Sequence, residues 1–396
     1  MEKWKRSLWI LWVGVLLSAA SYTMIVPFLP LYLLDLGVNP AKINLWSGVV
    51  FSITFLISSL MAPYWGSRAD KYGKRKMVIR AGISLAVVYF LGGVVRTPEE
   101  LFLVRALQGF ASGFVPASLS IVASSAPDDR MGWSLGIMQT GTATGGILGP
   151  LVGGVFSHFF GMRVSFAIAA VGVLLATLAV WMFVEEGHTV TEPQPSTIKE
   201  DLKTAAGNAP LVGILLLLMT VQVVVMALQP LITLHVAHLQ GALEGAVLSA
   251  GIIFSLTGVA GIIAAPSWGK YGQDVGFYKI LFIALIGAGL MNVGQYWVGT
   301  LWQFSLLQFA FGLFIIGVYP SINTLIVEHT ELHFRGRAFG LSTSANQMGG
   351  MIGPLLGGIA GSWMSVRSIF VSTGILLLFS AFMVWKLTRP WKEFLG

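Results

Sequence analysis

Gly66-Ser67-Arg68-Ala69-Asp70-Lys71-Tyr72-Gly73-Lys74-Arg75-Lys76 is the most informative segment of this 396-residue chain. It lies between two long apolar runs and contains five of the chain's 24 lysines and arginines. Its glycines adopt left-handed backbone angles easily, so we expect a charged loop that reverses the chain direction. Such a cationic loop is very costly to translocate, so the stretch indicates the cytoplasmic end of two membrane spans.

The composition of the whole chain also indicates a membrane protein. Hydrophobic residues make up 55% of the chain and charged residues only 10%, whereas soluble domains carry roughly 25% charged residues. The mean hydropathy is +0.79 and the pI is about 9.6. The basic residues lie in short loops between apolar runs, where they mark topology. We therefore expect membrane lipids, and no nucleic acid, as partners.

Several kinds of site are excluded or disfavoured by the residue types present. The chain has no cysteine, which excludes disulfides, iron–sulfur clusters and thiolate zinc sites. No nucleotide-binding glycine loop of the form G-x-x-x-x-G-K-[ST] occurs, so direct use of ATP is not expected. His235 with His238, and His329 with His333, lack a third ligand, and we interpret both pairs as solvated residues. No metal, no cofactor and no enzymatic activity are expected.

Apolar runs between charged breaks predict twelve membrane spans, each of about 20 residues or more. The first run imitates a signal peptide, but it continues to Leu34 and is too long for one, so we interpret it as an uncleaved helix. The fold class is therefore an all-α membrane protein. The predicted spans cover approximately residues 8–33, 44–65, 77–96, 100–123, 132–158, 164–184, 210–236, 245–267, 278–298, 302–326, 336–361 and 367–387.

The distribution of charge predicts the orientation of these spans. With the N-terminus inside, the inward loops and tails hold most of the lysines and arginines, and the outward side holds only Lys42, Arg96, Arg163 and Arg367. This asymmetry favours an even number of spans with both termini in the cytoplasm.

The two halves of the chain repeat each other. A shift of 204 residues places the run that starts at Gly145 on the run that starts at Gly349, and Gly113 on Gly317. One residue of slippage is needed to place Gly66 on Gly269. We predict an N-terminal six-helix half over 1–185, a polar linker over 186–208 and a C-terminal six-helix half over 209–396, arranged as pseudo-symmetric repeats.

Glycines recur every four residues in the fifth and eleventh predicted spans. This spacing keeps them on one helix face, where the missing side chains allow another backbone to approach closely, and tight helix packing is the simplest interpretation. The run in the fifth span includes a proline, which kinks a helix. Its members are Gly145, Gly149, Pro150, Gly153 and Gly154.

Arg105 is the only basic residue that we place inside a span, since we count those near span ends, such as Arg80 and Lys279, with the loops and tails. A buried guanidinium costs several kcal/mol unless it is paired, so Arg105 is a candidate functional residue. The alternative is that it lies near the outer end of its span and extends toward water.

These motifs resemble those of the drug:proton antiporters of the major facilitator superfamily. The stretch from Gly66 is similar to the family's loop signature G-x-L-A-D-x-x-G-R-K, with Arg68 in place of the usual apolar third residue. The run from Gly145 resembles the family's antiporter motif, and the segment from Arg105 resembles its motif R-x-x-x-G. Val26-Pro27-Phe28-Leu29-Pro30, Trp46-Ser47-Gly48 and Gly113-Phe114-Val115-Pro116 are similar to segments of bacterial multidrug exporters.

The resemblance implies an exporter driven by the proton gradient in the bacterial cytoplasmic membrane, functional as a monomer. It implies a proton-coupling role for Arg105, although the acid that many such exporters carry in span one is missing here. Asp35, Asp70 or Glu328 would then handle the proton, or coupling would differ. In the family fold Asp70 would lie beside the helix start at Arg335 and Arg337, and could clamp the cytoplasmic side.

The interface helices of such a fold supply polar, aromatic and methionine side chains for an adaptable cavity for amphipathic solutes. A dedicated exporter of one metabolite, such as a siderophore or a lipid-linked sugar, is the alternative on the same fold. The candidate cavity residues are Tyr22, Met24, Phe28, Trp46, Gln108, Phe110, Phe114, Gln139, Gln222, Met226, Gln229, Phe254, Phe311, Tyr319, Asn323, Asn346 and Gln347.

Overall fold

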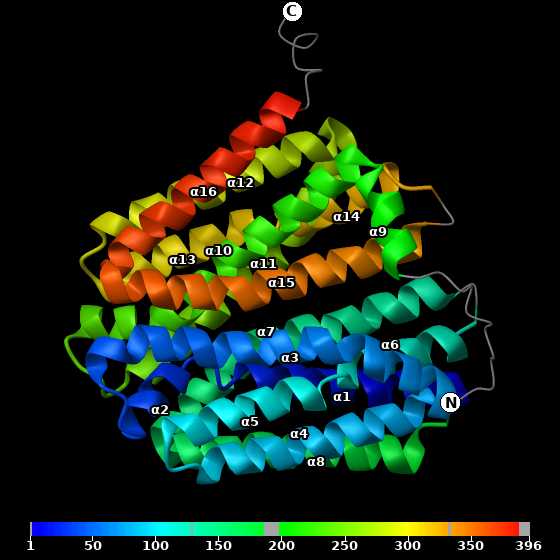
Figure 1. The fold of residues 1–396 in the computed structure, drawn as a ribbon, viewed down its shortest axis with the longest axis horizontal. Coiled ribbons are helices and arrows are strands. Elements are labelled where there is room, and N and C mark those ends of the chain that lie inside the picture. The colour runs from blue at the N-terminus through cyan, green and yellow to red at the C-terminus, as the bar shows by residue number, and fades with distance from the viewer. Residues whose placement is uncertain (1, 128–129, 186–197, 332–333, 388–396) are drawn as a thin grey trace, which may run out of the picture. The chain divides into compact units, whose positions relative to one another are not determined.

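The computed structural model describes residues 2–127, 130–185, 198–331 and 334–387, and within these ranges the chain is helical without a strand (Figure 1). The predicted all-α class is confirmed. The chain forms two compact units, which we describe separately. Unit 1 comprises Met1–Glu192 and Ile232–Ser255, and unit 2 comprises Pro193–Leu231 and Leu256–Gly396.

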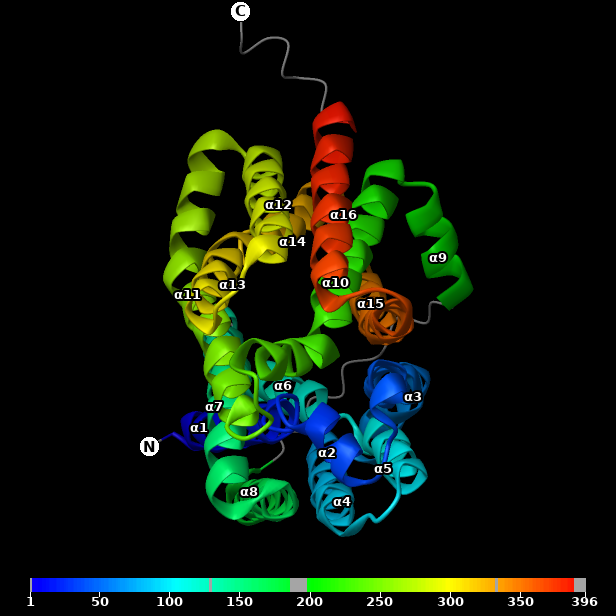
Figure 2. The same ribbon diagram turned by 90° about the vertical axis from the view of Figure 1, so that its left-hand side faces the viewer.

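Unit 1 consists of long helices joined by short turns. In Figure 2, α1 lies beside α7, and α4 lies beside α5 and α8. The last turns of α10 and the first turns of α11 also belong to this unit. Its own helices are α1 (Lys3–Thr23), α2 (Leu29–Asp35), α3 (Ile43–Tyr72), α4 (Lys74–Val94), α5 (Pro98–Ala111), α6 (Phe114–Ser125), α7 (Met131–Phe160) and α8 (Met162–Phe183), with a 3-10 turn η1 (Pro40–Lys42) before α3.

Unit 2 also consists of long helices joined by short turns, and an additional short helix, α9, precedes them. In it, α12 packs along α16 and α13. Within the predicted linker 186–208, the described residues form the helix α9 (Ile198–Ala206), and 186–197 lie outside the described residues. The other helices of this part are α10 (Ala209–Gln240), α11 (Ala246–Val275), α12 (Phe277–Gly294), the 3-10 turn η3 (Gln295–Trp297), α13 (Leu301–Ile315), α14 (Val318–Glu328), α15 (Arg335–Trp363) and α16 (Val366–Leu387).

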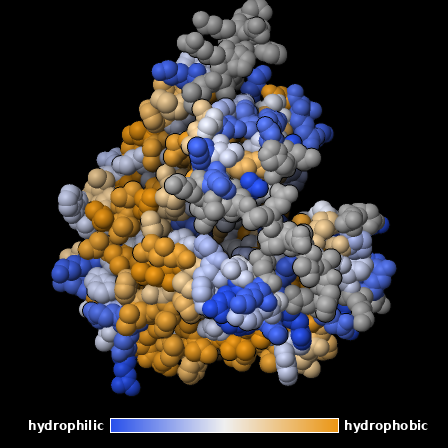
Figure 3. Space-filling model, turned by 45° about the vertical axis from the view of Figure 1, so that its right-hand side comes forward, coloured by the Kyte–Doolittle hydropathy of each residue, from blue (hydrophilic) through white to orange (hydrophobic). Residues whose placement is uncertain are grey.

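Ten helical stretches among the described residues are long and apolar enough to cross a membrane. On the face drawn in Figure 3, apolar side chains form continuous areas on each unit. α1 and α15 fall outside the ten: α1 begins with three basic residues, and α15 contains Arg335, Arg337 and many small polar residues and glycines. Multi-pass membrane architecture is therefore shown, and the count of twelve spans stays a prediction.

The predicted loop over residues 66–76 is wrong in one respect. α3 continues through Gly66 to Tyr72, and Gly73 alone, with φ 98°, separates it from α4. Arginine, alanine and lysine favour helix, so the helix extends through the charged stretch and only one residue needs a left-handed backbone. Unit 2 repeats this turn at Gly276, with φ 90°.

Three predicted spans are interrupted. The first is divided into α1 and α2 by turns over 24–28, and the fourth into α5 and α6 at Ser112 and Gly113. Gly113 has φ 119°, which ends α5 by reversing the backbone. The tenth is divided into α13 and α14 at Ile316 and Gly317. Apolar run length alone does not report such breaks, because they contain no charged residue and apolar residues flank them.

Candidate functional site

The glycines of α7 bring its backbone into direct contact with α1. A Cβ placed on Gly145 would lie 2.4 Å from the carbonyl oxygen of Leu16, and one on Gly153 would lie 2.0 Å from that of Met24. The hydroxyl of Thr23 donates a hydrogen bond across this contact to the carbonyl oxygen of Gly145, at 3.0 Å. The predicted close approach is thus present in unit 1.

The same helix uses a second glycine face against α11. A Cβ on Gly251 would lie 2.4 Å from the carbonyl oxygen of Pro150, and one on Gly154 would lie 3.1 Å from the Cα of Leu248. Ser255 Oγ donates to the carbonyl oxygen of Ile147 at 2.5 Å. Residues 232–255, which the sequence places in the C-terminal half, therefore pack with the first half in unit 1.

The glycines of α15 form the equivalent contact inside unit 2. A Cβ on Gly353 would lie 2.7 Å from the carbonyl oxygen of Val223 on α10, and one on Gly357 would lie 2.1 Å from that of Ala227. Tight packing is thus common to both repeats.

Arg105 is buried in unit 1, with 1% of its surface exposed. Its Nη1 donates to Gln108 Oε1 at 2.6 Å, and its Nε donates to the carbonyl oxygen of Val50 at 3.4 Å. The guanidinium lies 5.5 Å from the ring centre of Phe51 and 5.9 Å from that of Tyr22. It does not extend toward water, so the alternative of an exposed arginine is wrong.

The groups that the described residues place around this charge are neutral. Gln108 uses its oxygen for Arg105, so its Nε2 donates to the hydroxyl of Tyr89, at 3.2 Å. In the part of the chain that the structure describes, Arg105 forms no ion pair with a carboxylate. Tyr89 and Thr54, whose hydroxyl donates to the carbonyl oxygen of Arg105, were not predicted. The contact between Arg105 and Gln108 could have been predicted, because residues three apart on a helix are neighbours.

Unit 2 has a matching hydrogen bond at the position that corresponds to Arg105, but the residue there is neutral. Thr257 donates to the carbonyl oxygen of Gln308 at 3.4 Å, as Thr54 does to that of Arg105. Gln308 therefore occupies the position of Arg105. Its Nε2 donates to Gln295 Oε1 at 3.1 Å, and Gln295 in turn donates to Asn292. At this position of the repeat, unit 1 therefore holds a buried charge and unit 2 a neutral amide.

Two of the three predicted carboxylates lie at exposed helix ends. Asp35 is the last residue of α2 and Glu328 the last residue of α14, and both are exposed. The side chain of Asp70 lies outside what the structure describes. Arg335 and Arg337 lie in the first turn of α15. The identity of the proton-carrying group, and the clamp at Asp70, remain predictions.

The predicted cavity residues of unit 1 fall into two groups. Phe28 and Phe114 lie fully inside its core, where Phe28 packs edge-on against Phe166. Met24 and Gln108 are also buried. The second group is at least partly exposed and comprises Tyr22, Trp46, Phe110, Gln139 and Phe254.

In unit 2, Phe311 and Gln222 are buried, and Gln222 accepts a hydrogen bond from Tyr319 at 3.2 Å. The structure thus joins two predicted residues from α10 and α14. The predicted cavity residues of unit 2 that are at least partly exposed are Met226, Gln229, Tyr319, Asn323, Asn346 and Gln347. The substrate contacts themselves stay predictions.

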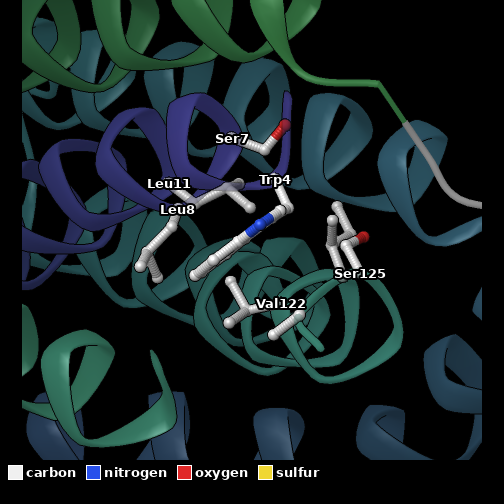
Figure 4. A pocket seen from close by; sticks show the side chains of 8 residues that line it. Trp4, Ser7, Leu8, Leu11, Val122 and Ser125 are labelled. Carbon is white, nitrogen blue, oxygen red and sulfur yellow. The ribbon is translucent and has the colours of Figure 1, made fainter. Parts of the chain in front are cut away.

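Figure 4 shows a gap between α1 and α6, lined by Trp4, Leu8, Val122 and their neighbours. It leaves no room for a water molecule, so it is a packing gap and not a binding site.

The histidines hold no metal cluster within the described ranges. His329 contacts the hydroxyl of Tyr278 through Nε2 and the carbonyl oxygen of Leu325 through Nδ1. His235 is buried, so the prediction of a solvated residue was wrong there, because its helix end packs inside unit 1. His333 lies outside the described residues.

Sequence comparison identifies the family of this chain. The family model of the Major Facilitator Superfamily matches residues 11–291 and 232–393. The chain belongs to the Major Facilitator Superfamily. It is therefore a membrane transporter and not an enzyme.

Bacterial relatives within the Major Facilitator Superfamily match almost the whole chain. The multidrug resistance protein MdtG of Salmonella paratyphi A is 34% identical over 388 residues, which is 98% of this chain and 96% of that protein. MdtG of Salmonella arizonae is 33% identical over 384 residues, 96% of this chain and 95% of that protein.

Solved structures of the superfamily share the fold. The nucleoside transporter NupG superposes with a TM-score of 0.83 at 15% identity, covering 97% of this chain and all of that one. A bacterial homologue of the human lysosomal transporter Spinster superposes with a TM-score of 0.81 at 14% identity, covering 98% of both chains. At these identities the comparison concerns the fold alone.

Proposed function

We propose that this chain exports amphipathic drugs or related small molecules across the bacterial cytoplasmic membrane in exchange for protons. The relatives named as multidrug resistance proteins support export of drugs. The observation that carries the proposal is the buried charge of Arg105, held only by neutral groups in unit 1. A fold retains a cation inside a membrane span at a cost of several kcal/mol, so the charge serves the transport cycle.

Arg105 acts in this proposal through the electrostatic potential inside the span. Gln108 and the carbonyl oxygen of Val50 fix the guanidinium in place, so its charge stays at one position during the cycle. A fixed positive charge lowers the affinity of nearby groups for a proton. Proton release from the coupling acid, for which Asp35, Asp70 and Glu328 are the candidates, would follow when that acid approaches this potential.

The glycine faces supply the moving contact in this proposal. Backbone lies directly on backbone between α7 and residues 248–251 of α11, which belongs to the other predicted half, so few side chains have to be rearranged when the halves shift. Alternating access by rocking of six-helix repeats around a central site is how such folds transport. The proposal includes cytoplasmic termini, action as a monomer and the proton gradient as the sole energy source.

Collapsing the pH gradient is expected to stop uphill transport completely. The measurement uses the purified chain in inverted vesicles without ATP, with an imposed pH gradient and a panel of dyes and drugs. Addition of a protonophore should reduce accumulation to the level of vesicles without protein. Undiminished accumulation under the protonophore would contradict proton coupling.

The same panel separates a multidrug exporter from a dedicated one. Transport of several chemically unrelated amphipathic compounds is the expected result. Transport of a single metabolite, with no competition by the drugs, would favour the dedicated exporter.

A further inference from the structure

Arg80 on α4 of unit 1 lies between α3 and the break between α5 and α6, and the transport proposal does not use it. Its guanidinium stacks on the indole of Trp65, with 3.5 Å from Cζ to the ring centre. Its Nη2 donates to the carbonyl oxygen of Ser112 at 2.9 Å, at the break between α5 and α6. A Cβ on Gly113 would lie 3.3 Å from the same nitrogen. We refer to this part of unit 1, where Arg80 contacts α3 and the α5–α6 break, as the Arg80 region.

Two of the donors of Arg80 are unused. Nε and Nη1 are covered, and among the described residues neither has a hydrogen-bond partner. An unsatisfied buried donor is costly, the more so on a charged group. The side chain as a whole is only half-buried. A hydrogen-bond acceptor from outside the protein can therefore reach these donors when the Arg80 side chain changes its conformation.

The fold does not need an arginine at this position. In unit 2, Trp268 donates to the carbonyl oxygen of Leu313 at 2.7 Å, as Trp65 does to that of Phe110 at 2.8 Å. The residue that corresponds to Arg80 is then Ile283, which is 45% exposed. The repeat therefore folds with an apolar side chain here, and the charge in unit 1 requires another explanation.

The residues around the Arg80 region are of the kinds found at the membrane–water interface. Trp65 and Arg80 lie eight and seven residues from the turn at Gly73, so both are about 10–12 Å from it along their helices. Tryptophan and tyrosine gather at this level of a bilayer. Tyr64 and Tyr72 are exposed, and Arg68 stacks on both rings at 5.0 and 5.3 Å. The predicted side is the cytoplasmic leaflet, which carries anionic lipids.

We propose that the Arg80 region binds the phosphate of an anionic phospholipid, with Arg80 Nε and Nη1 as donors and Trp65 as the platform that orients the guanidinium. Arg68, held between its tyrosines, adds a second positive charge closer to the water phase. The phosphate oxygens satisfy the two donors that the protein leaves unused. The acyl chains lie along the exposed apolar side chains of α3 and α5, where Leu60 and Phe110 are exposed.

The test is lipid binding by the purified full chain, measured by native mass spectrometry during titration with phosphatidylglycerol. Arg80→Ile, which introduces the residue found in unit 2, should weaken binding by about fivefold or more. Arg80→Lys keeps the charge but loses the stack and the fork, and should have an intermediate affinity. Gel filtration and circular dichroism establish that both variants are folded.

Arg163→Gln is the matched control, because Arg163 also lies over an aromatic ring, 5.9 Å from that of Tyr32. It should bind phosphatidylglycerol like the wild type. Wild-type affinity in folded Arg80→Ile would overturn the proposal, and so would equal weakening by Arg163→Gln. Phosphatidylcholine should bind more weakly, and millimolar inorganic phosphate should not compete. Competition by inorganic phosphate would overturn the assignment to a lipid.

Discussion

Gly153→Ala is expected to abolish transport and to lower the thermal stability of the protein. The new Cβ would lie 2.0 Å from the carbonyl oxygen of Met24 and 2.8 Å from its Cα. Both atoms belong to the backbone, so no side chain can rotate away and α7 must separate from α1. Overpacking of this kind costs typically 1–3 kcal/mol or more. The measurements are the melting temperature in detergent and dye transport in vesicles.

Gly146→Ala provides the control on the same helix. No atom lies within 4 Å of a Cβ at Gly146, and alanine has the higher helix propensity. This variant should keep wild-type transport and equal or higher stability. Equal transport rates and melting temperatures of Gly153→Ala and Gly146→Ala would show that the close contact of α7 with α1 does not exclude a side chain at position 153.

Arg105→Gln is expected to reduce uphill transport to background while the protein remains folded. Glutamine occupies the equivalent position in unit 2, where Thr257 donates to the carbonyl oxygen of Gln308 as Thr54 does to that of Arg105. The frame therefore tolerates an amide here, and the substitution removes charge with little change in packing. Uphill transport is measured in inverted vesicles with an imposed pH gradient.

Arg105→Lys should be partly impaired, because lysine keeps the charge but lacks the planar fork that reaches Gln108 and Val50 together. Gln308→Leu is the comparison in unit 2 and should affect stability more than coupling. Uphill transport at the wild-type rate in Arg105→Gln would show that coupled transport does not need the charge of Arg105.

The glycine contacts were predictable because they depend on spacing alone. Gly145, Gly149 and Gly153 recur at the period of a helix face, and no neighbouring helix has to be known to infer close packing. The surroundings of Arg105 were not predictable in the same way. Its partners come from residues far away in the sequence, Val50 on α3 and, through Gln108, Tyr89 on α4.

The register of the repeat shows why the sequence shift was ambiguous. An offset of 203 residues relates Thr54 to Thr257, Arg105 to Gln308 and Trp65 to Trp268 through matching hydrogen bonds. The offset of 204 holds from Gly113 and Gly317 onward. The extra residue falls at the break between α13 and α14, where Gly317 has φ −65° and Gly113 has φ 119°. A break in a helix absorbs an insertion without changing the apolar pattern.

The single-residue turn at Gly73 has a mechanical consequence. α3 contains 30 residues and is about 45 Å long, whereas the hydrocarbon core of a bilayer is about 30 Å thick. The charged end of α3 therefore projects as a stiff arm, joined to α4 with no slack. When the membrane part of α3 tilts, the tip must swing with it, through an arc that grows with its distance from the pivot. A reporter group at Tyr72 would consequently record the angle of the span itself.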